Sequence, residues 1–347
     1  MTVRKKLSKS KIDETSEFPV YSAESSNNGI VGYVNNPEFI CDEKNPVYVN
    51  FGDHTRNFNI ATKSFSVLDN VKVLLPKINN IRVLQFIISS WKKQIKNLGY
   101  SRHWKLAQDC LILLPTKDGE IDFKFMEEFI AELEAERIAE LEAYLTAAGL
   151  KDTILTAEEE IALKSFSTRR FEKFLLKDLF EMANTKSIVK EKIIPDSGKI
   201  PYVTASAENN GIMTYINCPA EWIDKGNCIM IGGKTLTFTY QEKNFCSNDS
   251  HNIVLYAKEK NLSKKIIYLF FMSAMRASMK NKYSWGNSIS MKKIQEDFLY
   301  LPTKDGEPDY EFMKNFITAV QKIVIADVVK YSEEKISAYR QAAMINS

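Results

Sequence analysis

Hydrophobic residues follow two different spacings along this chain. Over residues 125–145 and again over 312–336 they recur at three- and four-residue steps, which predicts two long helices, each with one apolar stripe. Gly149 predicts the end of the first of them. Shorter amphipathic helices are expected over 81–98 and 264–280. Short runs rich in β-branched and aromatic residues predict strands over 46–50, 64–67, 71–75, 228–231, 235–240 and 252–256. The mixture is typical of an α+β protein.

The sequence contains the same two blocks twice. Seventeen residues from Leu114 match 17 residues from Leu301, with 12 identities, and an upstream block from Phe18 matches one from Ile200. The offsets are 187 and 182, so the second copy carries about five additional residues between its blocks. Both copies contain Asn-Asn-Gly, which predicts a turn with positive φ angles. We therefore expect a tandem duplication.

Each copy ends in one of the long helices, which are expected to be roughly 40 to 50 Å long. A helix of this length with one apolar stripe either packs onto its own domain or pairs with another helix. Since the duplication supplies two matched helices, we expect an antiparallel coiled coil and a pseudo-twofold arrangement. The expected parts are a first globular domain 1–115, a first helix 116–150, a linker 151–170, a second globular domain 171–302 and a second helix 303–347.

The formal net charge of only +3 conceals a segregation of charge. Residues 54–108 contain ten Lys and Arg but one acid, and residues 225–293 contain twelve against three, so each stretch has a charge of +9. Residues 118–142, in the first long helix, contain ten acids against two basic residues. Two matched basic domains indicate a polyanionic partner, and we favour nucleic acid over an ordinary solvated surface. The acidic helix is expected to act as a spacer.

Composition excludes several other classes of protein. The chain is 44% hydrophobic and 26% charged, as expected for a globular protein. Its longest nearly apolar run, Ile266 to Met275, is about half of a bilayer span, and the basic N-terminus has no apolar stretch behind it. The five cysteines are scattered without a CxxC pair, so neither a zinc site nor a disulfide framework is expected, and a cytoplasmic location fits best.

No catalytic motif is complete. Gly232-Gly233-Lys234-Thr235 resembles the end of a phosphate-binding loop, but the first glycine of that motif is replaced by Cys228. Asn36-Pro37-Glu38-Phe39 lacks the second proline of an adenine methyltransferase loop. The three histidines have no spacing that suggests a metal site. The chain is therefore expected to be no enzyme by itself.

The duplicated layout resembles the specificity subunit of a type I restriction-modification system, or of a related type IIB system. The resemblance spans nearly the whole chain, and the order of the motifs is more specific than any one of them. The motifs that carry it are Phe51 to Arg56, Asp69 to Leu74, Phe171 to Glu181, Gly232 to Phe238 and Phe245 to His251.

This resemblance implies that residues 1–115 and 171–302 are target recognition domains, each reading one half of a bipartite DNA site. The helices would set the unread gap and dock methyltransferase subunits, with a restriction subunit as a further candidate partner. The chain itself would need no cofactor, since S-adenosylmethionine, ATP and Mg²⁺ would be bound by partner subunits. One departure is clear: no counterpart of Phe171 to Glu181 precedes Lys9-Ser10-Lys11, so the first domain is either shortened or completed by a partner.

Polar, basic and histidine side chains in the two basic stretches are the candidate DNA contacts, because Lys and Arg neutralise phosphates while amides, hydroxyls and His probe base edges. For Thr235 and Asn248, ordinary strand and turn roles are an equal alternative. The candidates are Arg56, Lys63, Arg102 and His103 in the first copy, and Lys234, Thr235, Gln241, Lys243, Asn248, His251, Lys280 and Asn287 in the second.

Two rival functions remain open at the level of sequence. The chain could be a DNA-cleaving or DNA-modifying enzyme with an unfamiliar active site, or a coiled-coil scaffold without DNA specificity. The recognised bases, the gap length, the oligomeric state and the choice between type I and type IIB systems are not encoded in any motif.

Overall fold

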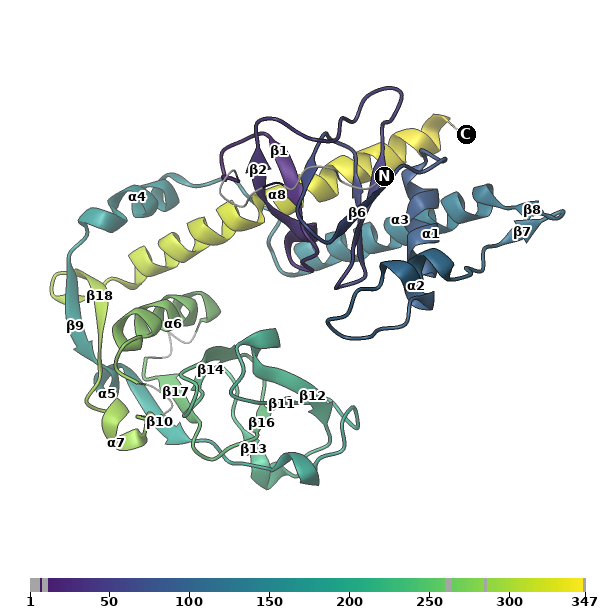
Figure 1. Cartoon of the computed structure of the whole chain (residues 1–347). Helices are drawn as coiled ribbons and strands as arrows, with labels where there is room; N and C mark the ends of the chain where they lie inside the picture. The colour runs from purple at the N-terminus through teal and green to yellow at the C-terminus, as the bar shows by residue number, and fades with distance from the viewer. Residues whose placement is uncertain (1–6, 8–11, 260–263, 284–285, 346–347) are drawn as a thin grey trace. The chain divides into compact units, whose positions relative to one another are not determined.

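A computed structural model describes residues 7, 12–259, 264–283 and 286–345, with the backbone alone for 340–345 (Figure 1). The chain forms two compact units. The first contains Met1–Ala143 with Lys335–Ser347, and the second contains Tyr144–Glu334. The stretch Lys9 to Lys11, which marked the short start of the first copy, lies outside the described residues.

The first unit contains two three-stranded sheets and a small hairpin. One sheet has the order β2-β1-β5, with β1 antiparallel to β2 and parallel to β5, and the other has the antiparallel order β4-β3-β6. The strands are β1 (Phe18–Tyr21), β2 (Ile30–Val34), β3 (Tyr48–Gly52), β4 (Asn57–Ala61), β5 (Ser66–Val67), β6 (Val71–Leu74), β7 (Thr116–Lys117) and β8 (Glu120–Ile121). The helices that follow them are α1 (Ile81–Gln94), α2 (Trp104–Asp109) and α3 (Phe123–Ala147), whose last four residues belong to the second unit.

The second unit repeats both sheets and adds one edge strand to each. Its sheets have the orders β12-β11-β16-β13 and β10-β17-β14-β15, and a third sheet has the order β19-β18-β9. The strands are β9 (Phe171–Leu175), β10 (Phe180–Asn184), β11 (Ile200–Val203), β12 (Ile212–Ile216), β13 (Ile223–Asp224), β14 (Cys228–Ile231), β15 (Phe238–Gln241), β16 (Phe245–Ser247), β17 (Ile253–Ala257), β18 (Phe298–Lys304) and β19 (Glu307–Pro308). The helices are α4 (Ala157–Ser165), α5 (Leu176–Leu179), α6 (Lys265–Met279), α7 (Met291–Ile294) and α8 (Tyr310–Ile345), whose last eleven residues belong to the first unit.

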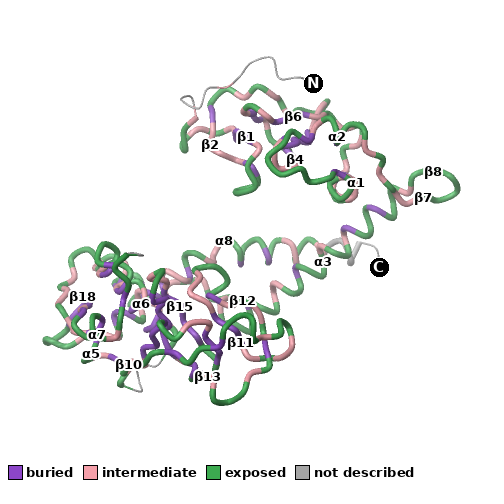
Figure 2. The backbone as a smooth tube through the Cα atoms, turned by 60° about the horizontal axis from the view of Figure 1, so that its bottom comes forward, coloured by how far each residue is buried: buried purple, intermediate pink, exposed green. Residues whose placement is uncertain are grey.

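Each unit has its own hydrophobic core. In the first, Tyr21, Tyr48 and Phe65 pack edge to face at 5.5 Å between ring centroids. In the second, Tyr268 and Phe271 of α6 are about 1% exposed and pack on the sheet that contains β14 and β15. Figure 2 shows buried residues gathered where α6 and β15 lie. Each fully buried side chain of this size contributes roughly 1.5–3 kcal/mol to folding.

The repeat predicted from sequence is confirmed by the matching sheets and turns. The predicted strands and amphipathic helices are present, with boundaries that move by a few residues. Asn28 and Asn210 have φ angles of 50° and 51°, and the glycine after each has φ of 77°. The Asn-Asn-Gly turns therefore adopt the left-handed backbone that their residue types favour.

Both long helices begin as predicted, directly after the Lys-Asp-Gly-Glu turn. Asp122 and Asp309 accept hydrogen bonds from the backbone N–H of Phe125 and Phe312, at 2.9 and 3.0 Å, and so cap the first turn of α3 and of α8. The second helix is longer, with 36 residues against 25. Among the residues that the structure describes, no helix is both long and apolar enough to cross a membrane.

The expectation about cysteine is wrong at one place. Cys218 and Cys246 form a disulfide in the second unit, although 28 residues separate them in sequence. No local motif announces this pair, because β-sheet pairing brings the two residues together only in the folded unit. The described thiols of Cys41, Cys110 and Cys228 are free.

Candidate nucleic-acid interface

Three loops of the first unit meet where β1, β3 and β5 end. They comprise residues 22–29, 53–56 and 68–70, and we call them the first loop cluster. The N–H of Ser22 donates to the carbonyl of Gly29 at 2.7 Å, and the N–H of Asp53 donates to the carbonyl of Asn70 at 2.8 Å. The first bond closes loop 22–29, and the second joins loop 53–56 to loop 68–70 at one end of the sheets.

Glycine at position 52 permits the close contact between two of these loops. A Cβ atom on Gly52 would lie 3.0 Å from the Cα of Ala23 and 2.9 Å from the hydroxyl of Thr55. A larger residue would therefore push loop 53–56 away from loop 22–29.

The second unit repeats this arrangement with residues 204–211, 232–237 and 248–252, which we call the second loop cluster. The hydroxyl of Thr235 donates to the carbonyl of Ala205 at 2.9 Å. The N–H of Gly233 donates to the side-chain oxygen of Asn252 at 3.2 Å, and the N–H of Asn248 donates to the carbonyl of Val203 at 3.0 Å. The same strands thus end in the same three loops.

The two loop clusters also share local backbone geometry. At an offset of 180, Gly52 and Thr55 correspond to Gly232 and Thr235, and Arg56 corresponds to Leu236. Arg56 and Leu236 both have a positive φ, at 58° and 52°. Duplicated loops that keep the same turn while their side chains differ are suited to reading two different sequences.

Two rings stack beside the first loop cluster. The imidazole of His54 lies parallel to the ring of Tyr100, which is 87% exposed, and His54 Nδ1 lies 3.3 Å from the carbonyl of Tyr100. Both side chains line a hollow of about 510 Å³ together with Ala23, Thr55 and Asn70. An exposed aromatic pair at the edge of a hollow can offer a planar face and a polar ring edge to a base.

A lysine and a histidine contact the same carboxylate in the second loop cluster. Lys234 Nζ is 3.4 Å from one oxygen of Asp249, and His251 Nδ1 is 2.8 Å from the other. Burial opposes ionisation of Asp249, but hydrogen bonds from the backbone and ring of His251 and from Lys234 hold the pKa of this carboxyl below its ordinary value. The ionised carboxylate positions one cation and one imidazole at the protein surface.

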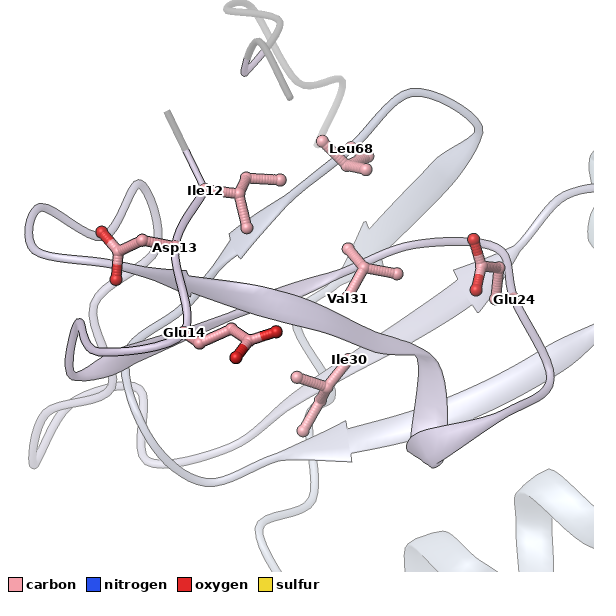
Figure 3. A pocket seen from close by; sticks show the side chains of 7 residues that line it. All are labelled: Ile12, Asp13, Glu14, Glu24, Ile30, Val31 and Leu68. Carbon is pink, nitrogen blue, oxygen red and sulfur yellow. The ribbon is translucent and has the colours of Figure 1, made fainter. Parts of the chain in front are cut away.

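A neighbouring hollow of the first unit is lined by three carboxylate side chains, those of Asp13, Glu14 and Glu24 (Figure 3). It has a volume of about 460 Å³ and shares Glu24 and Leu68 with the hollow beside His54. Hydrogen bonds from the hydroxyl and N–H of Ser16 lower the pKa of Asp13. Its carboxylates would repel DNA phosphates, so this hollow is a poor part of the interface.

Two of the residues predicted to contact DNA are buried instead. His103 is fully buried; its Nδ1 faces the carbonyl of Asp53 at 3.0 Å, and its Nε2 accepts the N–H of Leu98 at 3.0 Å. Gln241 is 3% exposed, and its amide donates to the carbonyl of Asn210 and to the hydroxyl of Thr239. Both side chains brace loops, and the prediction of base contacts is wrong for them because they have no free surface.

The other candidates of the first copy lie at different places. Arg102 is exposed and follows the loop of Tyr100, and Lys63 is exposed in the turn between β4 and β5. Arg56 lies in the first loop cluster, but its guanidinium donates to the carbonyl of Ile95 at 2.8 Å. Arg56 therefore also anchors the loop to the segment that follows α1.

Of the seven remaining candidates in the second copy, besides the buried Gln241, four come together and three do not. Lys234, Thr235, Asn248 and His251 all lie in the second loop cluster. Lys243 lies in the turn after β15, at the opposite end of that strand from residues 232–237. Lys280 ends α6, and Asn287 lies in the following loop, where its amide donates to the carbonyl of Lys282. Ser284 and Trp285 of that loop lie outside the described residues.

Sequence reasoning missed His54 and Tyr100 as a pair. His54 occurs in Phe51 to Arg56, a motif that carries the family resemblance, and Tyr100 occurs in the basic stretch 54–108. Aligning Gly52 on Gly232 would have placed His54 opposite Lys234, but no sequence signal joins His54 to Tyr100. Within the described part of the chain, His, Cys, Asp and Glu do not gather in groups of three or more that could bind a metal ion.

Comparisons with known proteins agree with this arrangement. A family model described as "Type I restriction modification DNA specificity domain" matches residues 2–143 and 169–329. The specificity subunit S.BcgI of the type II restriction enzyme BgcI from Heyndrickxia coagulans is 25% identical over 302 residues, 83% of each chain. The crystal structure of the S subunit of a type I restriction-modification system from M. genitalium covers 96% of this chain and 89% of its own, with a TM-score of 0.54. At 14% identity, this last similarity concerns the fold alone.

Proposed function

Because the chain belongs to the type I restriction modification DNA specificity domain family, we propose that its two loop clusters each read one half of a bipartite DNA target. The protein is a specificity subunit of a restriction-modification system, with duplicated target recognition domains. The observation that carries the proposal is the duplication of the loop clusters, with matching turns but different side chains.

Each loop cluster, with the residues beside it, offers groups suited to the steps of recognition. Exposed Lys234 and Arg102 can neutralise phosphates and so fix the position of the protein on the duplex. His54 with Tyr100, and Thr235 with His251, offer ring faces, hydroxyls and ring nitrogens to base edges. Since the side chains at equivalent positions differ, the two half-sites are expected to differ in sequence.

The long helices are proposed to set the gap between the half-sites. At 1.5 Å per residue, α3 and α8 are about 38 and 54 Å long. Within the first unit, the hydroxyl of Tyr339 on α8 lies 3.4 Å from Glu134 on α3. Pairing of the two helices along their length as an antiparallel coiled coil remains a prediction.

Catalysis is proposed to belong to other subunits. Relatives of this chain are specificity subunits, which are generally non-catalytic. We place DNA methylation, cleavage and the binding of S-adenosylmethionine, ATP and Mg²⁺ on modification and restriction subunits that dock on this chain in the cytoplasm. This chain would select the DNA sequence at which both reactions take place.

The test is to express the chain with a methyltransferase subunit of a restriction-modification system from the same genome and to map the methylated sites. The expected result is a motif of two short specific blocks separated by a fixed number of unspecified bases. A contiguous motif, or methylation by the partner without this chain, would contradict the proposal. Affinity of the complex for its site should fall by roughly 10³-fold or more between 50 and 200 mM salt.

A further inference from the structure

One surface that is covered in the second unit is uncovered in the first. In the second unit, β9 pairs antiparallel with β18, from Phe171 opposite Pro302 to Leu175 opposite Phe298 (Figure 1). Just before β9, the ring of Phe166 stacks on Phe316 at 4.3 Å between centroids. Residues 166–175 thus cover the last strand and the first turns of the long helix together.

An arginine fastens the same segment. Arg169 forms an ion pair with Asp309, the residue that caps α8, and its guanidinium lies 4.7 Å from the ring centroid of Phe312. Phe312 is consequently only 7% exposed. The segment therefore makes three kinds of contact: strand pairing, aromatic stacking and an arginine that reaches the helix start.

The equivalent residues of the first unit make none of these contacts within the described part of the chain. At the offset of 187, Asp122, Phe125 and Phe129 correspond to Asp309, Phe312 and Phe316, and residues 111–115 correspond to 298–302. Residues 111–115 form no strand, and Leu111 and Leu113 are 90% and 85% exposed. We call Leu111, Leu113, Asp122, Phe125 and Phe129 the uncovered face.

The aromatic rings of the uncovered face are already held in place by their own unit. Phe86 of α1 packs edge to face on Phe125 and Phe129, just as Phe270 of α6 packs on Phe316. Yet Phe125 and Phe129 remain 47% and 46% exposed. Exposed apolar surface of this kind, beside unpaired backbone, is typical of a site that accepts an added strand.

We propose that the uncovered face binds an extended segment of a second polypeptide, which carries aromatic residues and an arginine in the spacing of Phe166, Arg169 and Phe171. The segment adds a strand antiparallel to residues 111–115, stacks an aromatic ring on Phe129 and pairs its arginine with Asp122. This inference deepens the proposed function, because the natural source is a subunit of the restriction-modification complex.

Charge and composition favour this occupant over the alternatives. Residues 118–142 carry eight more acids than basic residues, whereas the covering segment 164–173 has four basic residues and one acid. A second copy of the chain is disfavoured, because its own segment already covers its second unit. The first eleven residues of the chain contain no aromatic residue and so lack the required pattern.

The probe is a synthetic peptide with the sequence of residues 163–176, labelled with a fluorophore and titrated with the full chain in the absence of DNA. We expect saturable binding at one site per chain. Leu113→Asp with Phe129→Asp should abolish it, and the milder Asp122→Asn should weaken it at least tenfold. Ile40→Asp, which changes an exposed apolar residue elsewhere in the first unit, should leave it unchanged, and a scrambled peptide should not bind.

Failure of the peptide to bind, or equal binding by the double variant with an unchanged circular dichroism spectrum, would overturn the inference. So would a dimer of the free chain that the same double variant dissociates, because the face would then be occupied by a second copy. No outcome of this experiment depends on DNA. A failure would therefore not contradict the reading of a bipartite target, which the map of methylated sites tests separately.

Discussion

The imidazole of His54 and the ring of Tyr100 are stacked, with centroids 4.6 Å apart and planes inclined by 7°. Forty-six residues separate them in sequence, and they come from a turn between two strands and from the loop that follows α1. Their position beside the first loop cluster makes them the sharpest local test of how the first half-site is read.

Replacing Tyr100 by Ala should weaken binding of the assembled complex to its target by about tenfold, since one aromatic contact is worth roughly 1–3 kcal/mol. Tyr100→Phe should retain most of the affinity, because the ring face is kept. Tyr144→Ala removes another exposed ring, 62% exposed on α3 and outside the cluster, and should have no effect. Equal affinities of Tyr100→Ala and the wild type in fluorescence titrations would exclude this pair from the interface.

Lys234 and Lys243 should behave differently, although both are exposed lysines of the same domain. Lys234 belongs to the second loop cluster, and Lys234→Ala should lower affinity for all sequences and reduce the slope of log affinity against log salt by about 1. Lys243 lies at the other end of β15, so Lys243→Ala should leave both quantities unchanged. A reduced salt slope in Lys243→Ala would mean that the duplex contacts the other end of the sheet, which would contradict the proposal.

The glycine of the second Asn-Asn-Gly turn should be irreplaceable. Gly211 has φ of +77°, and a Cβ atom there would lie 2.7 Å from the carbonyl oxygen of Thr204. Gly211→Ala should therefore cost about 2 kcal/mol of unfolding free energy and weaken DNA binding, because it moves loop 204–211. Among the described residues, no atom lies within 4 Å of a Cβ built on Gly286, so Gly286 is the matched control, and Gly286→Ala should unfold at the wild-type temperature. Thermal unfolding of both variants makes the comparison.

A buried lysine joins α8 to the segment that follows α3. Lys322, whose side chain is 11% exposed, contacts carboxylate oxygens of Asp152 at 2.8 Å and Glu159 at 3.1 Å and donates to the carbonyl of Ile154 at 2.7 Å. Lys322→Met should destabilise the second unit by about 2 kcal/mol, because Glu159, with an 8% exposed side chain, would lose its cation.

This network also predicts a pH dependence. The hydrogen bond from Lys322 lowers the pKa of Asp152 below 3.8, and the hydrogen bond to Asp152 is the main reason that the pKa of Lys322 lies above 10.5. Its stabilisation is thus fully present between those values, and it is lost as the pH falls through the lowered pKa of Asp152 or rises through the raised pKa of Lys322. Urea unfolding of the wild type and Lys322→Met should give a constant difference from about pH 5 to about pH 9 that shrinks in acid. A difference that persists unchanged at pH 2 would contradict the assigned pair.

The sequence alone determined the duplication, the two long helices and the left-handed Asn-Asn-Gly turns. Each of these depends on local chemistry or on the comparison of one copy with the other, so no knowledge of distant contacts was needed. The apolar spacing that predicts α3 and α8 can be recognised within the helical stretches themselves. The acidic charge of residues 118–142 can likewise be counted locally.

Only the tertiary structure decided which polar side chains face solvent. His103 and Gln241 carry the same donors and acceptors as an exposed reader of bases, yet sheet pairing and loop packing bury them, while His54 and Tyr100 are brought together at the surface. The disulfide between Cys218 and Cys246 and the unequal covering of Phe129 and Phe316 are likewise products of pairing between distant segments. Residue type fixes what a side chain can bind, but its exposure depends on which distant strands and loops pack against it, and that information is not local in the chain.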